Sequence, residues 1–380
     1  MELVWDLAIV GAGPAGSATA LGALTARPDL RVLLLDRAPF PRDKSCGDGI
    51  APHVLDVLAD VGVTGLLEDW KPVRRMRLHR GAEQVVRSMT RPARVVPRTV
   101  LDDRLVAAAQ RAGAELHHQR VRSVEARSDT VVLDDKLSAH LVVGADGAHS
   151  FVRAAAGLPP PPRRALAIRG YGPTPEERRG QQVMVFGKRR QPSYAWSFDR
   201  GDGLCNVGYG ELLRAGSTPP SRASLLGQLE SLLPGAAATG SSWLGHHLPL
   251  SSWRWHQPDG RMLLVGDAAG LINPMTGEGI YYAVATGVLA GRAAASALRA
   301  GDAGSAGSRH RVAVRSLLAR HLRHTAVASR LVGIPAVVSA GIRAAARDQA
   351  VFDDLVEVGL GQGLLTARAL RGLAGAAGRT

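Results

Sequence analysis

In the first part of the chain, short apolar runs alternate with a glycine-rich turn and an Ala/Leu-rich segment. An apolar run covers residues 4–10, glycines dominate residues 11–16, and an Ala/Leu-rich segment continues to about Ala26. A second apolar run, residues 31–35, ends at Asp36. Short continuous apolar runs are typical of buried parallel strands, and the segment between them has the length of a helix. The pattern therefore predicts a strand, a glycine turn, a helix and a second strand.

This glycine turn has the spacing of a dinucleotide-binding site. Gly11 would form the tight turn, Gly13 would let the backbone approach a pyrophosphate, and Gly16 would let the helix pack against the strand. Asp36 follows Gly16 by about 20 residues, the separation at which an acidic side chain accepts a hydrogen bond from a ribose. Free N–H groups at the helix start would favour the phosphates. The predicted contact residues in this region are Gly11, Gly13, Ala15, Gly16, Asp36 and Arg37.

Further along the chain, helical and strand-like patterns alternate up to about residue 160. Prolines and glycines punctuate this region and separate the periodic segments. The expected elements are a loop at 37–49, a helix at 51–60, a hairpin at 73–90, a helix at 98–113, short strands up to 132, and a strand at 141–143 that enters a turn.

The second half of the chain begins with strands and ends with helices. Turn residues separate strand-like segments between about 164 and 257, which is typical of an antiparallel sheet. The expected elements are strands at 181–187, 193–198, 204–210 and 242–250, a strand-turn unit at 261–270, an Ala-rich helix from about 277 to 300, and amphipathic helices over 309–380.

These elements predict an α/β protein with a Rossmann-like dinucleotide-binding domain built on a parallel sheet. An antiparallel-sheet substrate domain and C-terminal helices complete it. A Pro-rich spacer at 159–162 marks one crossing between the two domains. The expected boundaries are 1–72, 98–160 and 258–300 for the nucleotide-binding parts, 73–97 and 161–257 for the substrate domain, and 301–380 for the helices.

The chain is strongly basic, with a net charge of +14 over 380 residues. Only Lys44, Lys71, Lys136 and Lys188 are lysines, so the charge rests on arginine. Such a bias is explained either by genome composition or by attraction to an acidic partner, such as an anionic lipid surface, a diphosphate substrate or an acidic electron carrier. Nucleic acid is not an expected partner, because the basic residues are dispersed and no recognition motif accompanies them.

Cysteine content and hydropathy indicate where the protein works. The two cysteines, Cys46 and Cys205, form neither a disulfide framework nor a metal cluster, which suits a reducing cytoplasm. We therefore expect no metal site. The longest apolar segment, 331–342, contains Pro335 and ends at Arg343, so we expect no transmembrane span and no signal peptide. Peripheral contact with the inner face of the membrane remains compatible with the charge.

Three turns that combine glycine with an acidic residue each follow an apolar strand, at 11–16, 144–147 and 266–267. Taken alone, Asp146 and Asp267 are also compatible with ordinary turns or helix caps. In this order, the three turns resemble the FAD-binding sites of the para-hydroxybenzoate hydroxylase-like flavoproteins. The resemblance implies that Asp267 binds the ribityl or ribose of FAD, that the Asp146 turn lies close to FAD, and that the Arg98 helix packs beside it.

The same resemblance places segment 273–279 against the isoalloxazine ring. A helix starting at about Gly277 would direct backbone N–H groups at the edge of the flavin where negative charge collects on reduction. The FAD contacts implied for this part of the chain are Arg98, Asp146, Gly266, Asp267, Gly277, Gly279 and Ile280.

Two further motifs resemble those of the geranylgeranyl reductases. Residues 41–49, Pro-Arg-Asp-Lys-Ser-Cys-Gly-Asp-Gly, look like the Cys-Gly-x-Gly loop of that family, including its menaquinone and lipid-acting reductases. Residues 192–198, followed by Val207-Gly208, resemble its Pro-x-x-Tyr-x-Trp-x-Phe-Pro…Val-Gly motif, except that Asp199 replaces the last proline.

The geranylgeranyl reductase resemblance implies the remaining site residues. Cys46 and Gly47 would contact the flavin, and Cys46, Tyr194 and Trp196 would be catalytic. Alternation along a strand puts Tyr194, Trp196 and Phe198 on one face. Those rings form either an ordinary sheet core or an aromatic wall for a prenyl chain.

The resulting hypothesis is an FAD-dependent oxidoreductase that reduces C=C bonds of a hydrophobic prenyl substrate, either a geranylgeranyl lipid or a polyprenyl quinone. The chain contains no second complete nucleotide motif, so both NAD(P)H and reduced ferredoxin stay open as electron donors. One alternative is an FAD-dependent monooxygenase that epoxidises or hydroxylates an isoprenoid or aromatic substrate. Another is a non-catalytic flavin-binding protein.

Overall fold

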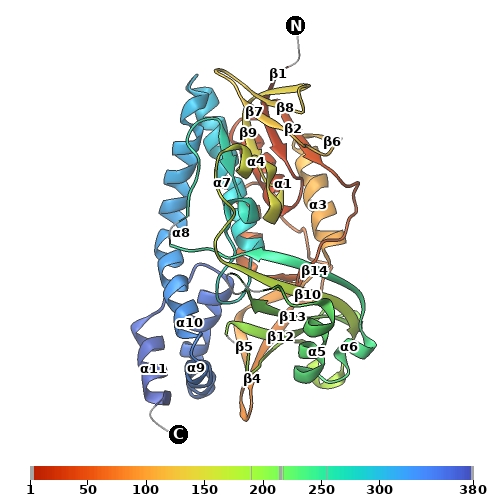
Figure 1. Cartoon of the computed structure of the whole chain (residues 1–380), viewed down its shortest axis with the longest axis vertical. Helices are drawn as coiled ribbons and strands as arrows, with labels where there is room; N and C mark the ends of the chain where they lie inside the picture. The colour runs from red at the N-terminus through yellow and green to blue at the C-terminus, as the bar shows by residue number, and fades with distance from the viewer. Residues whose placement is uncertain (1–3, 190, 214–215, 217, 254, 378–380) are drawn as a thin grey trace.

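The computed structural model describes residues 4–189, 191–213, 216, 218–253 and 255–377. Its first sheet is the parallel sheet expected from the apolar runs, and it lies at the top of Figure 1. In spatial order the strands are β6 (Glu115–His118), β2 (Val32–Asp36), β1 (Val4–Val10), β9 (Leu137–Gly144), β8 (Val131–Leu133) and β7 (Val124–Ala126), and β15 (Met262–Leu264) also pairs with β9. The strands β1, β2, β6, β9 and β15 run parallel, whereas β7 and β8 are antiparallel additions.

The register of this sheet brings the predicted turns together. Val10 at the end of β1 pairs with Leu35 and with Gly144, and Leu264 pairs with Gly144 on the other side of β9. The carboxyl ends of four parallel strands therefore meet at one edge, which is where ligands bind in such sheets. Asp36 ends β2 and lies at this edge.

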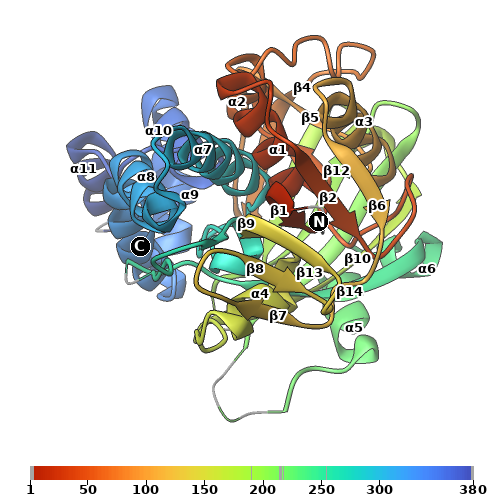
Figure 2. The ribbon, with the colours of Figure 1, turned by 90° about the horizontal axis from the view of Figure 1, so that it is seen from above.

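Two helices with small residues cover one side of this sheet. α1 (Pro14–Ala26) packs against α7 (Ile280–Arg299), and α7 lies between α1 and α8 in Figure 2. A Cβ atom on Gly291 would lie 2.1 Å from the Thr19 carbonyl oxygen, so only glycine permits this close crossing. The other helices of this part of the chain are α2 (Pro52–Ala59), α3 (Arg98–Arg111) and α4 (Phe151–Ala155).

The second sheet contains eight strands and occupies the lower part of Figure 1. Its order is β14 (Ser241–Pro249), β10 (Arg164–Pro173), β13 (Leu204–Leu212), β12 (Ser193–Asp199), β11 (Gln181–Phe186), β4 (Val73–Arg80), β5 (Glu83–Val95) and β3 (Gly49–Ile50). The pairs are antiparallel except β4 with β11, which run parallel and come from distant parts of the chain.

One face of this second sheet is covered by α5 (Arg222–Leu232) and α6 (Ala236–Thr239). Ala195 of β12 and Tyr209 of β13 pack there against Leu225 and Leu229. Because side chains alternate along a strand, Tyr194, Trp196 and Phe198 must point to the opposite face.

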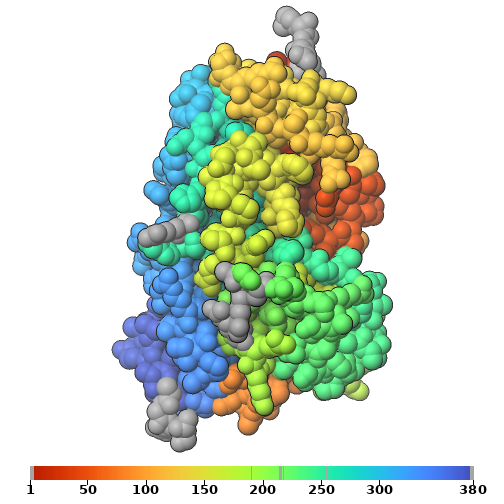
Figure 3. All heavy atoms as spheres, viewed as in Figure 1, coloured from red at the N-terminus to blue at the C-terminus, as the bar shows by residue number. Residues whose placement is uncertain are grey.

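The C-terminal region consists of α8 (Ala306–Leu331), α9 (Pro335–Arg347), α10 (Gln349–Leu360) and α11 (Ala367–Ala377). In the space-filling view this region forms one continuous side of the molecule (Figure 3). Within the described ranges, no single helix has both the length and the apolar composition of a membrane span. Only one pair of neighbouring segments, Ala303–Leu331 (which includes α8) and α9, meets both criteria when the two are taken together, and the pair is bent by 113°.

The structure refines several boundaries expected from the sequence. The Ala-rich helix begins at Ile280 rather than at about Gly277, and Gly279 is its N-cap residue. β10, α5 and α6 fall in the region where only four strands were expected. Of the expected C-terminal helical segment, residues 378–380 lie outside the described residues.

Candidate functional site: a cavity between the two sheets

A cavity of about 810 Å³ lies between the carboxyl edge of the first sheet and the open face of the second. This volume is in the range of sites that enclose a cofactor and a small substrate. Residues of the nucleotide-binding region, of the second sheet and of the C-terminal helix α10 contribute to its wall. The predicted site residues that line it are Gly11, Gly13, Ala15, Asp36, Arg37, Cys46, Gly47, Arg98, Asp146, Tyr194, Trp196, Asp267, Gly277, Gly279 and Ile280.

Two predicted contact residues, Gly16 and Gly266, do not line this cavity. A Cβ on Gly16 would lie 1.8 Å from the Gly11 carbonyl oxygen, and one on Gly266 would lie 3.3 Å from the Ala15 Cβ. Both glycines therefore shape the site by allowing elements behind it to pack closely. Direct contact of either glycine with FAD stays a prediction.

The nucleotide end of the cavity is built by α1 and the end of β2. Asp36 accepts a hydrogen bond from the Ala12 N–H (2.9 Å) and another from the Ala38 N–H (3.0 Å). Asp36 thus holds the glycine turn in place in addition to facing the cavity. The first turn of α1 carries no acidic side chain and no side-chain cap, so its N–H groups remain available to an anion.

A buried cluster of charges flanks Gly13. Arg98 forms a two-pronged ion pair with Asp102 (2.5 and 2.7 Å), and Arg42 lies 3.2 Å from Asp102 and 3.3 Å from Asp36. Burial lowers the pKa of Arg98, but the adjacent Asp102 carboxylate more than compensates, and the net shift is upward. The cluster therefore stays charged and keeps positive groups beside the helix N-terminus.

These features fit FAD. A Cβ on Gly13 would enter the space between Arg42 and Arg98, the place where the turn must admit a pyrophosphate. The Nε of Arg42 is buried and has no hydrogen-bond partner among the described residues. A pyrophosphate would supply the missing acceptor. Gly13, Ala15, Asp36, Arg42 and Arg98 would hold the nucleotide half.

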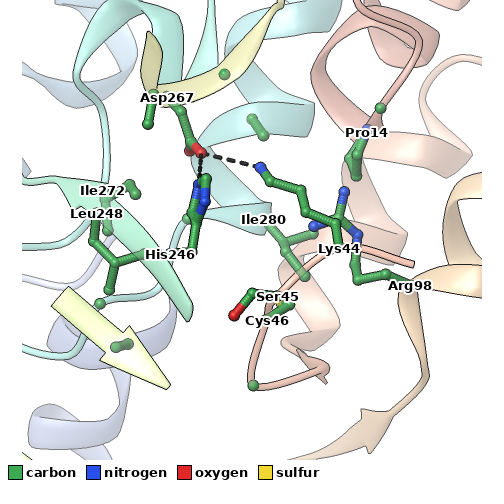
Figure 4. Close-up of a pocket in the computed structure, with 18 of the residues that line it drawn as sticks. Pro14, Lys44, Ser45, Cys46, Arg98, His246, Leu248, Asp267, Ile272 and Ile280 are labelled. Atoms are coloured by element: carbon green, nitrogen blue, oxygen red, sulfur yellow. Dashed lines mark hydrogen bonds and ion pairs between the residues drawn. The ribbon is translucent and has the colours of Figure 1, made fainter. Parts of the chain in front are cut away.

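Asp267 lies across the cavity from α1, as Figure 4 shows. Lys44 Nζ is 3.2 Å from its Oδ2, and His246 Nε2 is 3.8 Å from the same atom. Burial would raise the pKa of Asp267, but Lys44 and His246 overcome that effect and the pKa is lowered. Asp267 is therefore an ionised acceptor, suited to hydroxyl groups such as those of a ribityl chain. Lys44 ties the Cys46 loop to this acid.

Asp146 both faces the cavity and supports α4. Its Oδ2 accepts hydrogen bonds from the N–H groups of Phe151 (2.7 Å) and Val152 (3.3 Å). Burial raises its pKa, partly offset by these hydrogen bonds. The capping role considered for this aspartate in the sequence is thus present alongside its place in the cavity wall.

Cys46 lies in the loop that the sequence singled out. Its Sγ accepts a hydrogen bond from the Asp48 N–H (3.3 Å), and its carbonyl accepts one from Asn206 Nδ2 (2.8 Å). Burial, with a contribution from the Asp48 carboxylate, raises the pKa of Cys46 to about 11. The thiol is therefore neutral at physiological pH and is no thiolate nucleophile.

Asp48 is a buried acid that sequence reasoning did not select. Its Oδ2 accepts hydrogen bonds from Tyr171 Oη (2.6 Å) and Asn206 Nδ2 (2.9 Å), while its Oδ1 has no partner among the described residues. Its φ of +59° lies in the left-handed region, which aspartate tolerates better than most residues. Burial raises its pKa to about 6, despite the two hydrogen bonds. The only feature of the sequence that could have pointed to Asp48 is its position between two glycines, two residues after Cys46.

The even-numbered side chains of β12 form an aromatic wall, here meaning Tyr194, Trp196 and Phe198. Adjacent ring centroids in this wall are 6.0 and 6.4 Å apart. Trp196 Nε1 donates to Asn206 Oδ1 (2.8 Å), and Tyr194 Oη donates to the Thr276 carbonyl. Because both polar hydrogens are taken by the protein, the wall offers apolar ring surface to the cavity. A Cβ on Gly47 would lie 3.5 Å from Phe198, so the Cys46 loop packs directly on this wall.

Glu278 is a second acid that the sequence reasoning passed over, although it lies in the quoted segment 273–279. It lines the same cavity as Cys46 and Tyr194, and its Oε1 accepts a hydrogen bond from the Tyr281 N–H (2.9 Å). Burial raises its pKa to about 7. Asn206, Tyr171 and Asp102 also shape the site, and no motif marked them.

Comparison with known proteins agrees with this geometry. Residues 5–183 match a family model described as an FAD binding domain. The chain is 35% identical over 319 residues to menaquinone reductase of Mycolicibacterium smegmatis, covering 75% of each chain. It is 31% identical over 317 residues to digeranylgeranylglycerophospholipid reductase 1 of Methanopyrus kandleri, covering 78% of this chain and 82% of the relative.

Solved structures share the fold. A geranylgeranyl bacteriochlorophyll reductase-like protein from Thermoplasma acidophilum superposes with a TM-score of 0.80 at 19% identity, over 98% of this chain and 96% of that one. A flavin-dependent brominase gives 0.73 at 15% identity, over 98% and 97%. At such identities the likeness establishes the architecture alone.

The fold and the site define this protein as an FAD-dependent oxidoreductase. Within that class, the chain belongs to the geranylgeranyl reductase family of flavoproteins, as its Cys46 loop and Tyr194 motif indicated.

Proposed function

We propose that this protein reduces C=C bonds in the isoprenoid chain of a lipid or quinone. The observation that carries the proposal is the aromatic wall packed against the Cys46 loop, which gives the cavity an apolar surface opposite the nucleotide site. The names of the relatives, menaquinone reductase and digeranylgeranylglycerophospholipid reductase, support it.

The reaction adds a hydride to one alkene carbon and a proton to the other. The hydride would come from reduced FAD held at the nucleotide end of the cavity. An isolated alkene accepts hydride poorly, so the protein must hold it in place, exclude water and deliver the proton in step. The aromatic wall and the Cys46 loop would position the alkene between them.

Glu278 is our proposed proton donor. A general acid works best when its pKa lies near the working pH. The pKa of Glu278 is raised to about 7, whereas that of Cys46 is raised to about 11, where the thiol holds its proton too firmly. Cys46 would then act by positioning the alkene, while the carboxylic acid of Glu278 delivers the proton.

The decisive experiment uses FAD-loaded protein reduced chemically without oxygen. Geranylgeranyl lipid or menaquinone is added, and the product is analysed by mass spectrometry. We expect a product that stays heavier by two hydrogens after any quinol formed from the quinone ring has been reoxidised. A product heavier by one oxygen atom under air would identify a monooxygenase instead. Turnover with NAD(P)H or with reduced ferredoxin would then identify the electron donor; the net charge of +14 favours an acidic carrier protein.

Replacing Cys46 by serine should leave FAD bound and lower the rate of alkene reduction at least ~10-fold, about 1.4 kcal/mol of barrier. A hydroxyl is more strongly hydrated than a thiol and would bring water to the apolar surface. The measurement is the single-turnover rate of flavin reoxidation by the prenyl substrate. The matched control is Cys205→Ser, because Cys205 is buried and does not line the cavity. An unchanged rate combined with weaker FAD binding would show that Cys46 only packs.

We also propose that the protein is cytoplasmic and contacts anionic membranes peripherally. At the bend between α8 and α9, Val327 and Ile334 expose 47% and 53% of their surface, and Arg323 and Arg330 beside them are exposed. Apolar side chains among cations are suited to an anionic interface.

Flotation with anionic liposomes should recover the protein at low salt and lose it at high salt. The double variant Val327→Ser/Ile334→Ser should float less. Leu204→Ser, at the start of β13 and 41% exposed, is the control because it lies outside α8 and α9. If the protein does not bind the liposomes at low salt, the positive charge does not serve membrane binding, and genome composition remains its explanation.

A further inference from the structure

A second cavity, of about 130 Å³, lies between the strands β4 and β11 and the helices α8, α9 and α10. Its lining is apolar except for Gln191 and Thr276. Both exceptions are hydrogen-bonded to the protein: Gln191 Nε2 donates to the Gly187 carbonyl (3.0 Å) and Thr276 Oγ1 to the Gly359 carbonyl (2.7 Å). The polar side chains among the described lining residues are thus bonded within the protein, and such a cavity favours an apolar occupant.

The second cavity adjoins the first one. Among the described residues, the wall shared by the two cavities consists of Pro192, Thr276, Leu360 and three methionines, Met76 of β4, Met184 of β11 and Met275. Methionine is unbranched and flexible, so these three side chains can move aside at low cost. A flexible apolar partition is what a chain passing from one cavity to the next requires.

The C-terminal helices are fixed to the loop that faces the flavin position. Asn273 Nδ2 donates to the Val358 carbonyl (2.9 Å), and Ser329 Oγ donates to the Pro274 carbonyl (3.1 Å). These bonds hold the second cavity at a constant position relative to the aromatic wall. The C-terminal helices thereby gain a role that their sequence did not suggest.

We propose that the second cavity binds the isoprene unit next to the one that is reduced, and so selects substrates that continue with a branched unit beyond the reacting bond. This inference rests on the proposed function for its substrate class. The volume is close to that of a dry protein cavity of ~150 Å³ that accepts a benzene-sized ligand. It therefore has room for about one five-carbon unit.

The test fills the cavity from α8 with Ala328→Phe. Ala328 is buried and lines the second cavity but not the first. We expect the Kd of phytanol, a saturated isoprenoid alcohol that cannot react, to rise at least about tenfold in the FAD-loaded protein. The Kd of isopentanol, too short to reach both cavities, should not change. The matched control is Ala319→Phe, a half-buried position on the same helix that lines neither cavity.

Val337→Phe, on α9 at the same cavity, provides a second variant if the first does not fold. The inference would be overturned if a cavity-filling variant that retains FAD lost the binding of phytanol and of isopentanol equally. Unchanged phytanol binding would also overturn it. The inference would also be overturned if an unbranched alcohol of the same length bound as tightly as phytanol. If Ala328→Phe selectively loses phytanol binding while the wild-type protein reduces no prenyl lipid, the tail site would be supported and the proposed reaction rejected.

Discussion

Replacing Gly13 by valine should give a folded protein that purifies without its yellow cofactor. Gly13 has φ −69° and ψ −170°, which valine adopts without strain. The added Cβ would lie 3.2 Å from Arg42 Nη2 and 3.7 Å from Arg98 Nη2, both ends of flexible side chains. The valine would therefore fill the space between the two guanidinium groups that a pyrophosphate needs. We expect FAD affinity to fall at least ~100-fold, about 2.8 kcal/mol.

The measurement is a fluorescence titration of the purified protein with FAD, with circular dichroism to confirm folding. Gly227→Val is the matched control, because Gly227 lies in α5, is exposed, and would have no atom within 4 Å of an added Cβ. Flavin binding of normal strength in the Gly13 variant would contradict the assignment of the glycine turn. Gly11 is unsuitable for this test. Its φ of +99° and a 2.4 Å approach of an added Cβ to the Ala145 carbonyl oxygen would endanger the fold itself.

Replacing Glu278 by glutamine should lower the rate of alkene reduction by about 100-fold, the lower end of the usual contribution of a general acid. The amide keeps the shape and can still accept the hydrogen bond from the Tyr281 N–H. It cannot release a proton. FAD binding should be unchanged, because the pyrophosphate and ribose contacts lie elsewhere in the cavity.

The pH dependence gives this prediction a sharper form. Burial raises the pKa of Glu278 to about 7, although hydrogen bonds from the backbone of Tyr281 and Ile280, and the nearby His53, oppose the shift. Only the protonated acid donates, so the wild-type rate should be constant below pH 7 and fall as the pH rises above it. The Glu278→Gln variant should lose this alkaline limb. The limb should persist in Asp48→Asn, since Asp48 has a pKa of about 6 and a separate network. A limb that vanishes in Asp48→Asn and stays in Glu278→Gln would transfer the role to Asp48.

The start of the fold and one wall of the site could be predicted from local chemistry. Apolar runs define β1 and β2, and Gly11 and Gly16 occupy positions where a Cβ would collide with backbone. The alternation of Tyr194 and Trp196 determines which face of β12 they share. These properties depend on backbone sterics and strand geometry over a few residues, so the sequence suffices to read them.

The local sequence pattern did not predict helix boundaries and strand pairings that depend on residues far away in the chain. The helix near Gly277 begins three positions later than expected, because the segment before it is tied to α10 through Asn273, 85 residues from Val358. The parallel pairing of β4 with β11 joins elements that no local pattern connects.

The sequence by itself determined a dinucleotide turn, an α/β fold and an aromatic strand beside a cysteine loop, because each depends on neighbouring residues. Only the tertiary structure decided which acids can carry protons. Asp48 meets Tyr171 and Asn206 across 123 and 158 residues, and the pKa of Glu278 rises because folding removes it from water. Desolvation and hydrogen bonding are set by everything that surrounds a group in space, and hydrophobic periodicity along the chain carries no record of them.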